Sequence, residues 1–144
     1  MGSRKPVAYY RPPDVTTIKG CRVVLIPVSG AADVSVSCSV RIRWTASDAI
    51  AGAHHLLEHV LVTGGWKECG DAPCTEILAQ QTISARASVG IDSANYSVHG
   101  PREELDTMLA FMTGIMLDPV IRESAIIREK PAVRAELLPK AKRA

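Results

Sequence analysis

Hydrophobic and polar residues alternate along one long stretch of the chain. Apolar side chains occupy every second position from residue 34 to residue 44, and serine and arginine side chains fill the odd positions between them. Because successive residues of a strand point to opposite faces of a sheet, this alternation predicts a strand with one buried face and one polar face. A shorter apolar run at 22–26 predicts another strand that ends before Pro27.

Further elements follow from turn residues and helical spacing. Strands are predicted near 83–89 and 93–99, with 90–92 as the turn between them. Helices are predicted at 49–62, capped by polar residues 45–48 and closed by Gly64-Gly65, at 76–81, capped by Thr75, and at 122–138. Another helix has Pro101 in its first turn and a core stripe of Leu105, Met108, Leu109, Met112 and Ile115.

These elements indicate an α+β fold, with a mostly antiparallel sheet of about four strands and helices packed on one face. The 144 residues, of which 47% are hydrophobic, can bury one core, and no internal repeat is visible. We expect residues 1–19 to form an N-terminal extension and residues 20–144 to form a single domain.

Charge and length exclude several classes of partner. The net charge is only +2, and charges of both signs are interspersed except in the basic tail at 140–143, so we expect neither nucleic-acid nor membrane binding. Residues 1–10 lack the pattern of a secretory signal. Pro6, Pro12 and Pro13 would interrupt the amphipathic helix of a mitochondrial presequence. We therefore expect a cytoplasmic protein, with a mitochondrial location left open.

The four cysteines, Cys21, Cys38, Cys69 and Cys74, could form either disulfides or a thiolate metal site, but neither is well supported. Cys69 and Cys74 are close enough in sequence for half of a metal site, but no second Cys or His pair lies at a matching distance. Cys38 falls on the apolar side of the predicted strand and can pack as a small hydrophobic residue. We therefore expect free thiols, as in a reducing compartment.

The candidate chemistry lies in the sequence His55-Leu56-Leu57-Glu58-His59, inside the helix predicted at 49–62. Two histidines four residues apart share one helix face, so two ring nitrogens can converge on one metal ion. Glu58 is close enough to take a proton from a water at that metal without being a ligand. This order is the inverted zincin pattern. An amphipathic helix with His and Glu on its solvent face would contain the same residues.

A catalytic zinc ion needs a third protein ligand and an open position for water. Glu129 and Glu136, in the last predicted helix, are seven residues apart and therefore lie on nearly the same face, two turns from each other. Either glutamate can complete the ligand set. Pro131 lies between them and predicts a kink that would rotate one relative to the other.

With these residues the chain resembles the pitrilysin/insulinase family of zinc metallopeptidases. In that family a glutamate ligand follows the His-x-x-Glu-His motif after 76 residues, and here 76 residues separate His59 from Glu136. The resemblance covers about residues 20–139. Residues similar to those of the family also stand at Gly52, Ala87, Tyr96, Asp118 and Pro119.

The resemblance implies that His55, His59 and Glu136 bind zinc and that Glu58 is the general base. It implies that Glu129 orients a ligand histidine. The fold it implies is a metallohydrolase-like half-domain of the pitrilysin/mitochondrial processing peptidase type. Because family catalytic units combine two related halves and this chain is shorter than one half, we expect a second half-domain or an oligomer partner.

The resemblance also implies a substrate site. Peptides in this family add a strand to an exposed sheet edge, and the equivalent stretch is 84–88, with Arg86, Ala87 and Ser88 as substrate-binding residues. The family usually has Asn where Arg86 stands. An edge strand covered by another part of the protein is the alternative interpretation.

The sequence therefore predicts a zinc-dependent endopeptidase or peptidase subunit that cleaves short or unfolded peptides. The alternative is a non-catalytic zinc-binding or partner-binding fragment of a metallopeptidase. A third hypothesis is a hydrolase of another small substrate on the same scaffold, because fold and metal do not determine the substrate.

Overall fold

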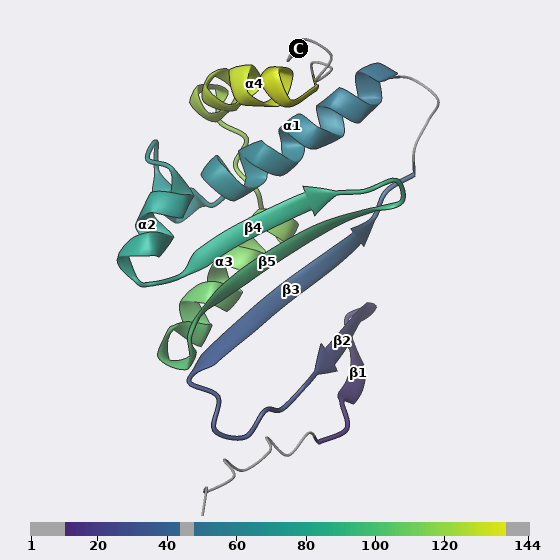
Figure 1. The fold of residues 1–144 in the computed structure, drawn as a ribbon, viewed down its shortest axis with the longest axis vertical. Helices are drawn as coiled ribbons and strands as arrows, with labels where there is room; N and C mark the ends of the chain where they lie inside the picture. The colour runs from purple at the N-terminus through teal and green to yellow at the C-terminus, as the bar shows by residue number, and fades with distance from the viewer. Residues whose placement is uncertain (1–10, 44–47, 138–144) are drawn as a thin grey trace, which may run out of the picture. The chain divides into compact units, whose positions relative to one another are not determined.

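The computed structural model describes residues 11–43 and 48–137 (Figure 1). The chain forms two compact units, Met1–Ala32 and Asp33–Ala144. Helices and two antiparallel sheets confirm the predicted α+β class. The predicted caps at 45–47, Trp44 and the basic tail at 140–143 lie outside the described residues. None of the helices in the described part is both long and apolar enough to cross a bilayer.

The first unit contains a two-stranded hairpin. Strand β1 (Asp14–Ile18) pairs with β2 (Cys21–Leu25), with Ile18 opposite Cys21. Lys19 and Gly20 have φ values of 49° and 82°, as the two central residues of a type I′ turn require. The structure thus confirms the strand predicted at 22–26 and adds β1, which the apolar pattern did not predict.

The sheet of the second unit has three strands in the order β3-β5-β4. Strand β3 (Asp33–Arg41) and strand β4 (Ser84–Val89) both pair with the central β5 (Ser93–Pro101) in antiparallel register. Side-chain exposure alternates along β4, β5 and residues 33–39 of β3, as the sequence predicts for β3, but Val40, predicted on the apolar face, is 43% exposed. One face of the sheet is therefore apolar, and it includes the buried Ala94, Tyr96 and Val98 of β5.

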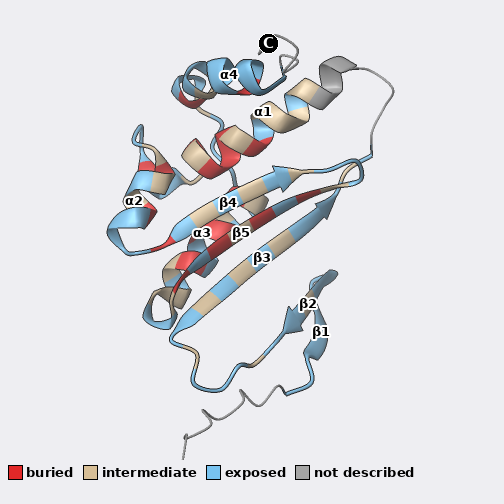
Figure 2. Cartoon of the chain, in the orientation of Figure 1, coloured by how far each residue is buried: buried red, intermediate tan, exposed pale blue. Residues whose placement is uncertain are grey.

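Three helices bury their apolar residues against this face. They are α1 (Asp48–Gly64), α2 (Cys74–Gln80) and α3 (Leu105–Leu117), and Figure 2 shows buried residues in each of these helices and along the central strand β5. Leu61, Leu78 and Phe111 belong to one core cluster with the three buried residues of β5. Helix α4 (Glu123–Leu137) packs on α1 and is thus separated from the sheet.

Three local predictions need correction. Helix α2 begins at Cys74 after Pro73, not at Glu76 after Thr75, because the Pro73 carbonyl already accepts hydrogen bonds from the amides of Glu76 and Ile77. Pro101 ends β5, and a 3-10 turn at Arg102–Glu104 separates it from α3. Leu109 is 43% exposed, because the buried stripe of α3 runs through Met108, Phe111, Met112 and Ile115.

The expectation of free thiols is wrong for two of the four cysteines. Cys69 and Cys74 form a disulfide, with their Cα atoms 5.2 Å apart. A 3-10 helix at Lys67–Cys69, in a stretch predicted as loop, and a positive φ of 57° at Gly70 turn the chain back, so the start of α2 returns to Cys69. Cys21 and Cys38 are not part of this disulfide, and both keep the thiols that the sequence predicts.

We predict that Gly114→Ala destabilises the protein. A Cβ atom at Gly114 in α3 would lie 2.5 Å from Cδ1 of Trp66, whose ring is already packed edge-on against Phe111. The overpacking, typically 1–3 kcal/mol, opposes a gain in helix propensity of about 1 kcal/mol. Chemical denaturation should show a lower free energy of unfolding.

The matched control is Gly52→Ala in α1, where the added Cβ would meet only a Leu137 side-chain carbon at 3.6 Å. This variant gains helix propensity without a clash, so its free energy of unfolding should rise by up to about 1 kcal/mol. Equal stabilisation by both substitutions would show that Trp66 yields and that the packing argument is wrong.

Candidate metal centre

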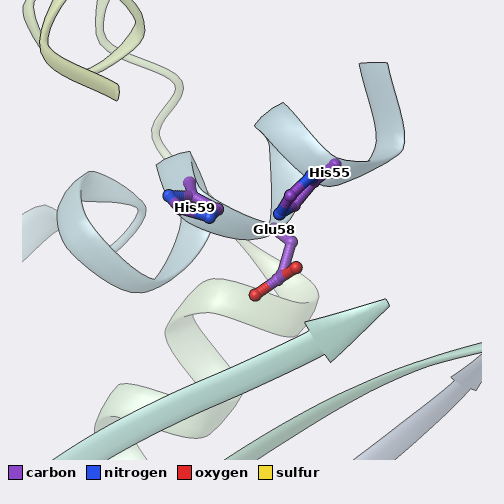
Figure 3. A group of neighbouring side chains, drawn as sticks. All are labelled: His55, Glu58 and His59. Carbon is purple, nitrogen blue, oxygen red and sulfur yellow. The ribbon is translucent and has the colours of Figure 1, made fainter. Parts of the chain in front are cut away.

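Helix α1 presents the two histidines on one side. The rings of His55 and His59 lie with centroids 4.9 Å apart at 72°, and Figure 3 shows both projecting from successive turns. Glu58 lies between them in sequence and is only 8% exposed. Ligand atoms of His55, Glu58 and His59 all lie within 4.8 Å of one another. The helix therefore assembles two imidazoles and one carboxylate as a group that can hold a metal ion.

Helix α4 brings two further carboxylates to the same histidines. Oε2 of Glu136 lies 3.2 Å from Nε2 of His55 and 3.9 Å from Nε2 of His59. Oε2 of Glu129 lies 3.3 Å from Nδ1 of His59. The Glu136 carboxylate thus faces Nε2 of both rings, whereas Glu129 contacts Nδ1, the other nitrogen of the His59 ring.

Pro131 lies inside α4, which spans Glu123–Leu137 as one helix. The kink predicted from the sequence does not carry Glu136 away from the histidines. Glu129 and Glu136, two turns apart, both face α1. The two glutamates therefore keep the common azimuth that their spacing predicts.

Helices α1 and α4 run antiparallel, so residues earlier in α1 contact residues later in α4. A Cβ atom on Gly64, at the end of α1, would lie 2.7 Å from Cβ of Ala125, near the start of α4, so only glycine allows this approach. Farther from this close approach, His59 contacts Glu129, and His55 contacts Glu136. The close contact at one end thus sets which glutamate reaches which histidine.

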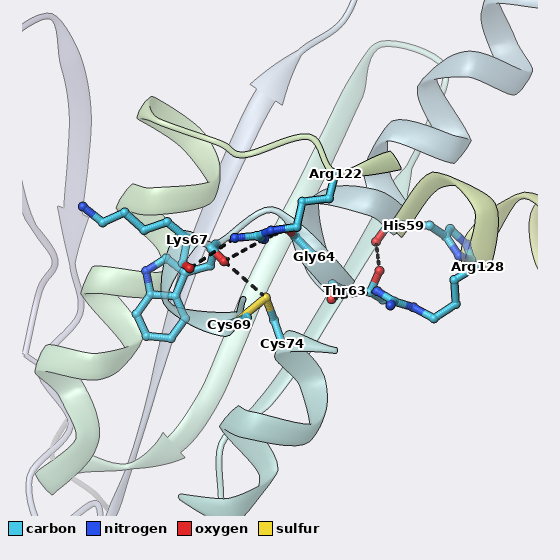
Figure 4. The surroundings of a disulfide bond; sticks show 9 residues. His59, Thr63, Gly64, Lys67, Cys69, Cys74, Arg122 and Arg128 are labelled. Atoms are coloured by element: carbon cyan, nitrogen blue, oxygen red, sulfur yellow. Dashed lines mark hydrogen bonds between the residues drawn. A yellow bond between two sulfur atoms is a disulfide. The ribbon is translucent and has the colours of Figure 1, made fainter. Parts of the chain in front are cut away.

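Arg122, just before α4, and Arg128, within α4, bind the chain at the end of α1 (Figure 4). The guanidinium of Arg122 donates hydrogen bonds to the carbonyls of Gly64 (2.7 Å), Trp66 (3.3 Å) and Lys67 (3.2 Å). Arg128 donates to the Thr63 carbonyl and to Oε1 of Glu129, both at 3.3 Å. Because helix-terminal carbonyls lack partners within their own helix, the bonds to Thr63 and Gly64 satisfy the end of α1, and those to Trp66 and Lys67 join the segment after α1 to the start of α4.

Neither Arg122 nor Arg128 is predicted from the sequence as a site residue. No spacing rule links an arginine to carbonyls some sixty residues earlier in the chain. The signal available in the sequence was the position of Arg128 next to Glu129, where a cation can hold the neighbouring carboxylate.

Burial shapes the electrostatics of the centre. Desolvation raises the pKa of Glu58, against the opposing effect of His59 and His55, and the nearby Glu136 raises it further. Burial also raises the pKa of Tyr96, with a contribution from the charge of Glu58. Tyr96 on β5 therefore lies within electrostatic reach of Glu58, which places the carboxylate over the sheet.

The donor set fits a tetrahedral metal ion. Zinc bonds of 2.0–2.1 Å at tetrahedral angles put ligand atoms about 3.4 Å apart. The distances of 3.2 and 3.9 Å from Glu136 to the two Nε2 atoms bracket that value. Two imidazoles and one carboxylate are also a ligand combination found in catalytic zinc sites.

The predicted substrate residues lie on an edge strand. Within the described sheet, β4 pairs only with β5, so its other edge carries no strand. Arg86 and Ser88 are exposed, and Ala87 is half-buried under α1. The roles predicted for these residues, and for those of the metal centre, stay predictions.

Comparisons with known proteins agree with this arrangement. The model of the insulinase family, peptidase family M16, matches residues 34–140. Among solved structures, the chain is similar to one described as the crystal structure of a protease from Helicobacter pylori, with a TM-score of 0.73 and 20% identity. That similarity covers 89% of this chain and 31% of the other, so this chain spans about a third of that protein's length. No curated protein matches this sequence significantly.

We predict that Arg122→Gln lowers the free energy of unfolding by about 1–3 kcal/mol, because three carbonyl groups lose a charged donor. Arg134→Gln is the matched control, since Arg134 is an exposed arginine of α4, and it should change stability by less than about 0.5 kcal/mol. Urea denaturation measures both. Similar small effects from the two variants would show that the hydrogen bonds of Arg122 do not stabilise the protein.

We predict that Glu58→Gln stabilises the metal-free protein at pH 7. A carboxyl with a raised pKa binds its proton more tightly in the folded state, so its contribution to stability is lost as pH rises from the unfolded value toward the folded one. The neutral amide lacks this penalty. Thermal unfolding in chelator should therefore give a higher Tm for the variant at pH 7, and a smaller difference near pH 4.

The control for this comparison is Glu68→Gln, which changes an exposed glutamate of the 3-10 helix after α1. It should leave Tm nearly unchanged at both pH values. A Glu58→Gln variant that is less stable than the wild type at pH 7 would show that the charged carboxylate stabilises the metal-free fold.

Proposed function

Because this chain belongs to the insulinase family of peptidases, family M16, we propose that it is the zinc-binding catalytic unit of a metallopeptidase, with His55, His59 and Glu136 as ligands. The observation that carries the proposal is the position of the Glu136 carboxylate, whose Oε2 atom faces Nε2 of both histidines from a different helix. Helix amphipathicity alone does not require such a contact between α1 and α4. The contact therefore supports a set of metal ligands that the packing of α4 on α1 brings together.

The other two glutamates have different tasks. Glu129 accepts a hydrogen bond from Nδ1–H of His59, which leaves the lone pair of Nε2 free for the metal. Arg128 holds the second oxygen of Glu129 and so fixes the direction of that bond. Glu129 therefore orients His59 without contacting the reacting atoms.

Glu58 is the proposed general base. When bound, a zinc ion at these ligands polarises the peptide carbonyl and acidifies the attacking water. The Glu58 carboxylate accepts the proton of that water and then delivers it to the leaving nitrogen of the peptide. Burial, which raises the pKa of Glu58, makes the carboxylate a stronger base than an exposed glutamate.

Two carboxylates compete for the place of third ligand, since Glu58 also lies within ligand distance of the histidines. We assign that place to Glu136 because its oxygen approaches both Nε2 atoms, and because Glu58 has the burial and raised pKa expected of a base. The assignment is testable, because a ligand and a base respond differently to removal of their charge.

The proposed substrate is an extended peptide bound along β4. The edge of β4 that faces away from β5 offers backbone donors and acceptors to an added strand. Figure 3 shows the Glu58 carboxylate directed from α1 toward β4, so a peptide on this edge would pass beside the base. Backbone pairing accounts for short or unfolded peptides as the substrate class.

A second candidate is a zinc-stabilised module that does not cleave peptides. The observation that favours it is that this chain spans only 31% of the protease it resembles in structure. In this alternative the metal links α1 to α4 and stabilises the fold, and catalysis requires residues of another half-domain or of an oligomer partner.

We predict one zinc ion per chain, with opposite responses of the two candidate carboxylates. Glu136→Gln should weaken zinc binding by at least about tenfold, because a charged ligand is lost, whereas Glu58→Gln should retain zinc and lose cleavage of a fluorogenic peptide by at least about a hundredfold. Metal content is measured by atomic absorption after dialysis, and affinity by competition with a chromogenic chelator.

Glu123→Gln, at the exposed start of α4, is the control and should change neither quantity. If Glu58→Gln loses zinc and Glu136→Gln keeps it, the ligand and base assignments are reversed. Zinc bound by the wild type without any cleavage would favour the non-catalytic module.

A further inference from the structure

The face of the sheet opposite the helices is made of small polar residues around a few cations. Ser37 of β3, Ser97 of β5 and Arg86 of β4 form one row across the three strands. The same face also carries Asp33, Ser35, Ser39 and Arg41 of β3, Ser93, Asn95, His99 and Pro101 of β5, and Ser84 and Ser88 of β4.

Arg86 is the only charged side chain that β4 carries. It is exposed, and its neighbours on the same face, Ser84, Ser88 and Ser97, are too short to cover it. Within the described part of the chain, the guanidinium forms no hydrogen bond or ion pair. Its charge is therefore available to a molecule that lies along β4.

The carboxylate of this face does not neutralise Arg86. Asp33 lies on the opposite edge strand, where its Oδ2 atom is 3.8 Å from Nε2 of His99. His99 in turn pairs with Ser84, at the end of β4, and accepts or donates a hydrogen bond at Ser35. Since no carboxylate of the described residues contacts the Arg86 guanidinium, a carboxylate of a bound peptide could pair with it.

Arg86 is next to the part of β4 that approaches the metal centre. Ala87 pairs with Tyr96, and Tyr96 lies within electrostatic reach of Glu58. Ala85 and Ala87 point to the face that α1 covers, whereas Arg86 points to the polar face. A strand added to β4 would therefore have alternate side chains facing the metal centre and the row of Arg86.

We propose that Arg86 selects extended peptides with an acidic side chain at the position that pairs with Arg86 on the free edge of β4. The inference rests on the proposed function, which supplies the extended peptide as the ligand. Directly paired residues of neighbouring strands have side chains on the same face, with Cβ atoms about 5 Å apart. Aspartate or glutamate at that position reaches the guanidinium, and lysine or arginine is repelled by it.

The expected preference is modest because the pair is exposed to solvent. Exposed ion pairs contribute about 0.2–1 kcal/mol, which corresponds to a preference of up to about fivefold. Salt screens such a pair, so the preference should shrink as the ionic strength rises from 0.05 to 0.5 M, values near which the Debye length falls from over 10 Å to under 5 Å. A preference caused by shape would not respond to salt.

The test uses a set of otherwise identical peptides in which one glutamate is moved along the sequence, each with a matched glutamine peptide. Cleavage by the zinc-loaded chain gives kcat/KM, and fluorescence anisotropy with the Glu58→Gln variant gives Kd without turnover. We expect one position at which glutamate improves Kd by about two- to fivefold over glutamine. Arg86→Gln should abolish this ratio, and Arg86→Glu should make lysine the preferred residue there.

Arg41→Gln is the matched control, because Arg41 is an exposed arginine of the same sheet face on the opposite edge strand. It should leave the ratio unchanged. An equal glutamate-to-glutamine ratio in the wild type and Arg86→Gln overturns the inference. If peptides bind with the expected preference and none is cleaved, the proposed function fails and the inference stands; if no peptide binds, both fail.

Discussion

The packing of α4 on α1 decides the distances from the histidines to Glu129 and Glu136, because the histidines belong to one helix and these two glutamates to the other. Gly64 lets the helices approach at one end, and Arg122 binds the carbonyl groups that end α1. From that origin the antiparallel helices place Glu129 at His59 and Glu136 at His55. A few contacts outside the centre thus position the two carboxylates that α4 contributes to it.

The centre concentrates groups that repel one another or resist burial when no metal ion is bound. Glu58 is buried and has a raised pKa, and Glu136 adds a second negative charge nearby. A divalent cation between these carboxylates and the imidazoles would relieve the repulsion. The arrangement is therefore more consistent with a functional site than with a structural ion-pair network, in which opposite charges would already balance.

In the proposed function, the sheet connects the metal centre to the edge strand along which a peptide would lie. In the part of the chain that the structure describes, β4 pairs only with β5, so its other edge is unpaired, and the face of β4 opposite the helices is polar. Pairing on that edge uses the backbone and hardly discriminates between sequences. Discrimination must then come from side chains beside the edge, and Arg86 is the charged one on β4.

Local patterns in the sequence determined the strand alternation of β3, the helical pairing of His55 with His59 and the common azimuth of Glu129 and Glu136, because these depend on backbone periods of two or 3.6 residues. The long spacing to Glu136 identified the family but not the contact. Only the tertiary structure decided that Glu129 meets Nδ1 of His59 while Glu136 meets Nε2 of both rings, and that Cys69 pairs with Cys74. Helix packing and chain reversal fix those distances, and no local period encodes either.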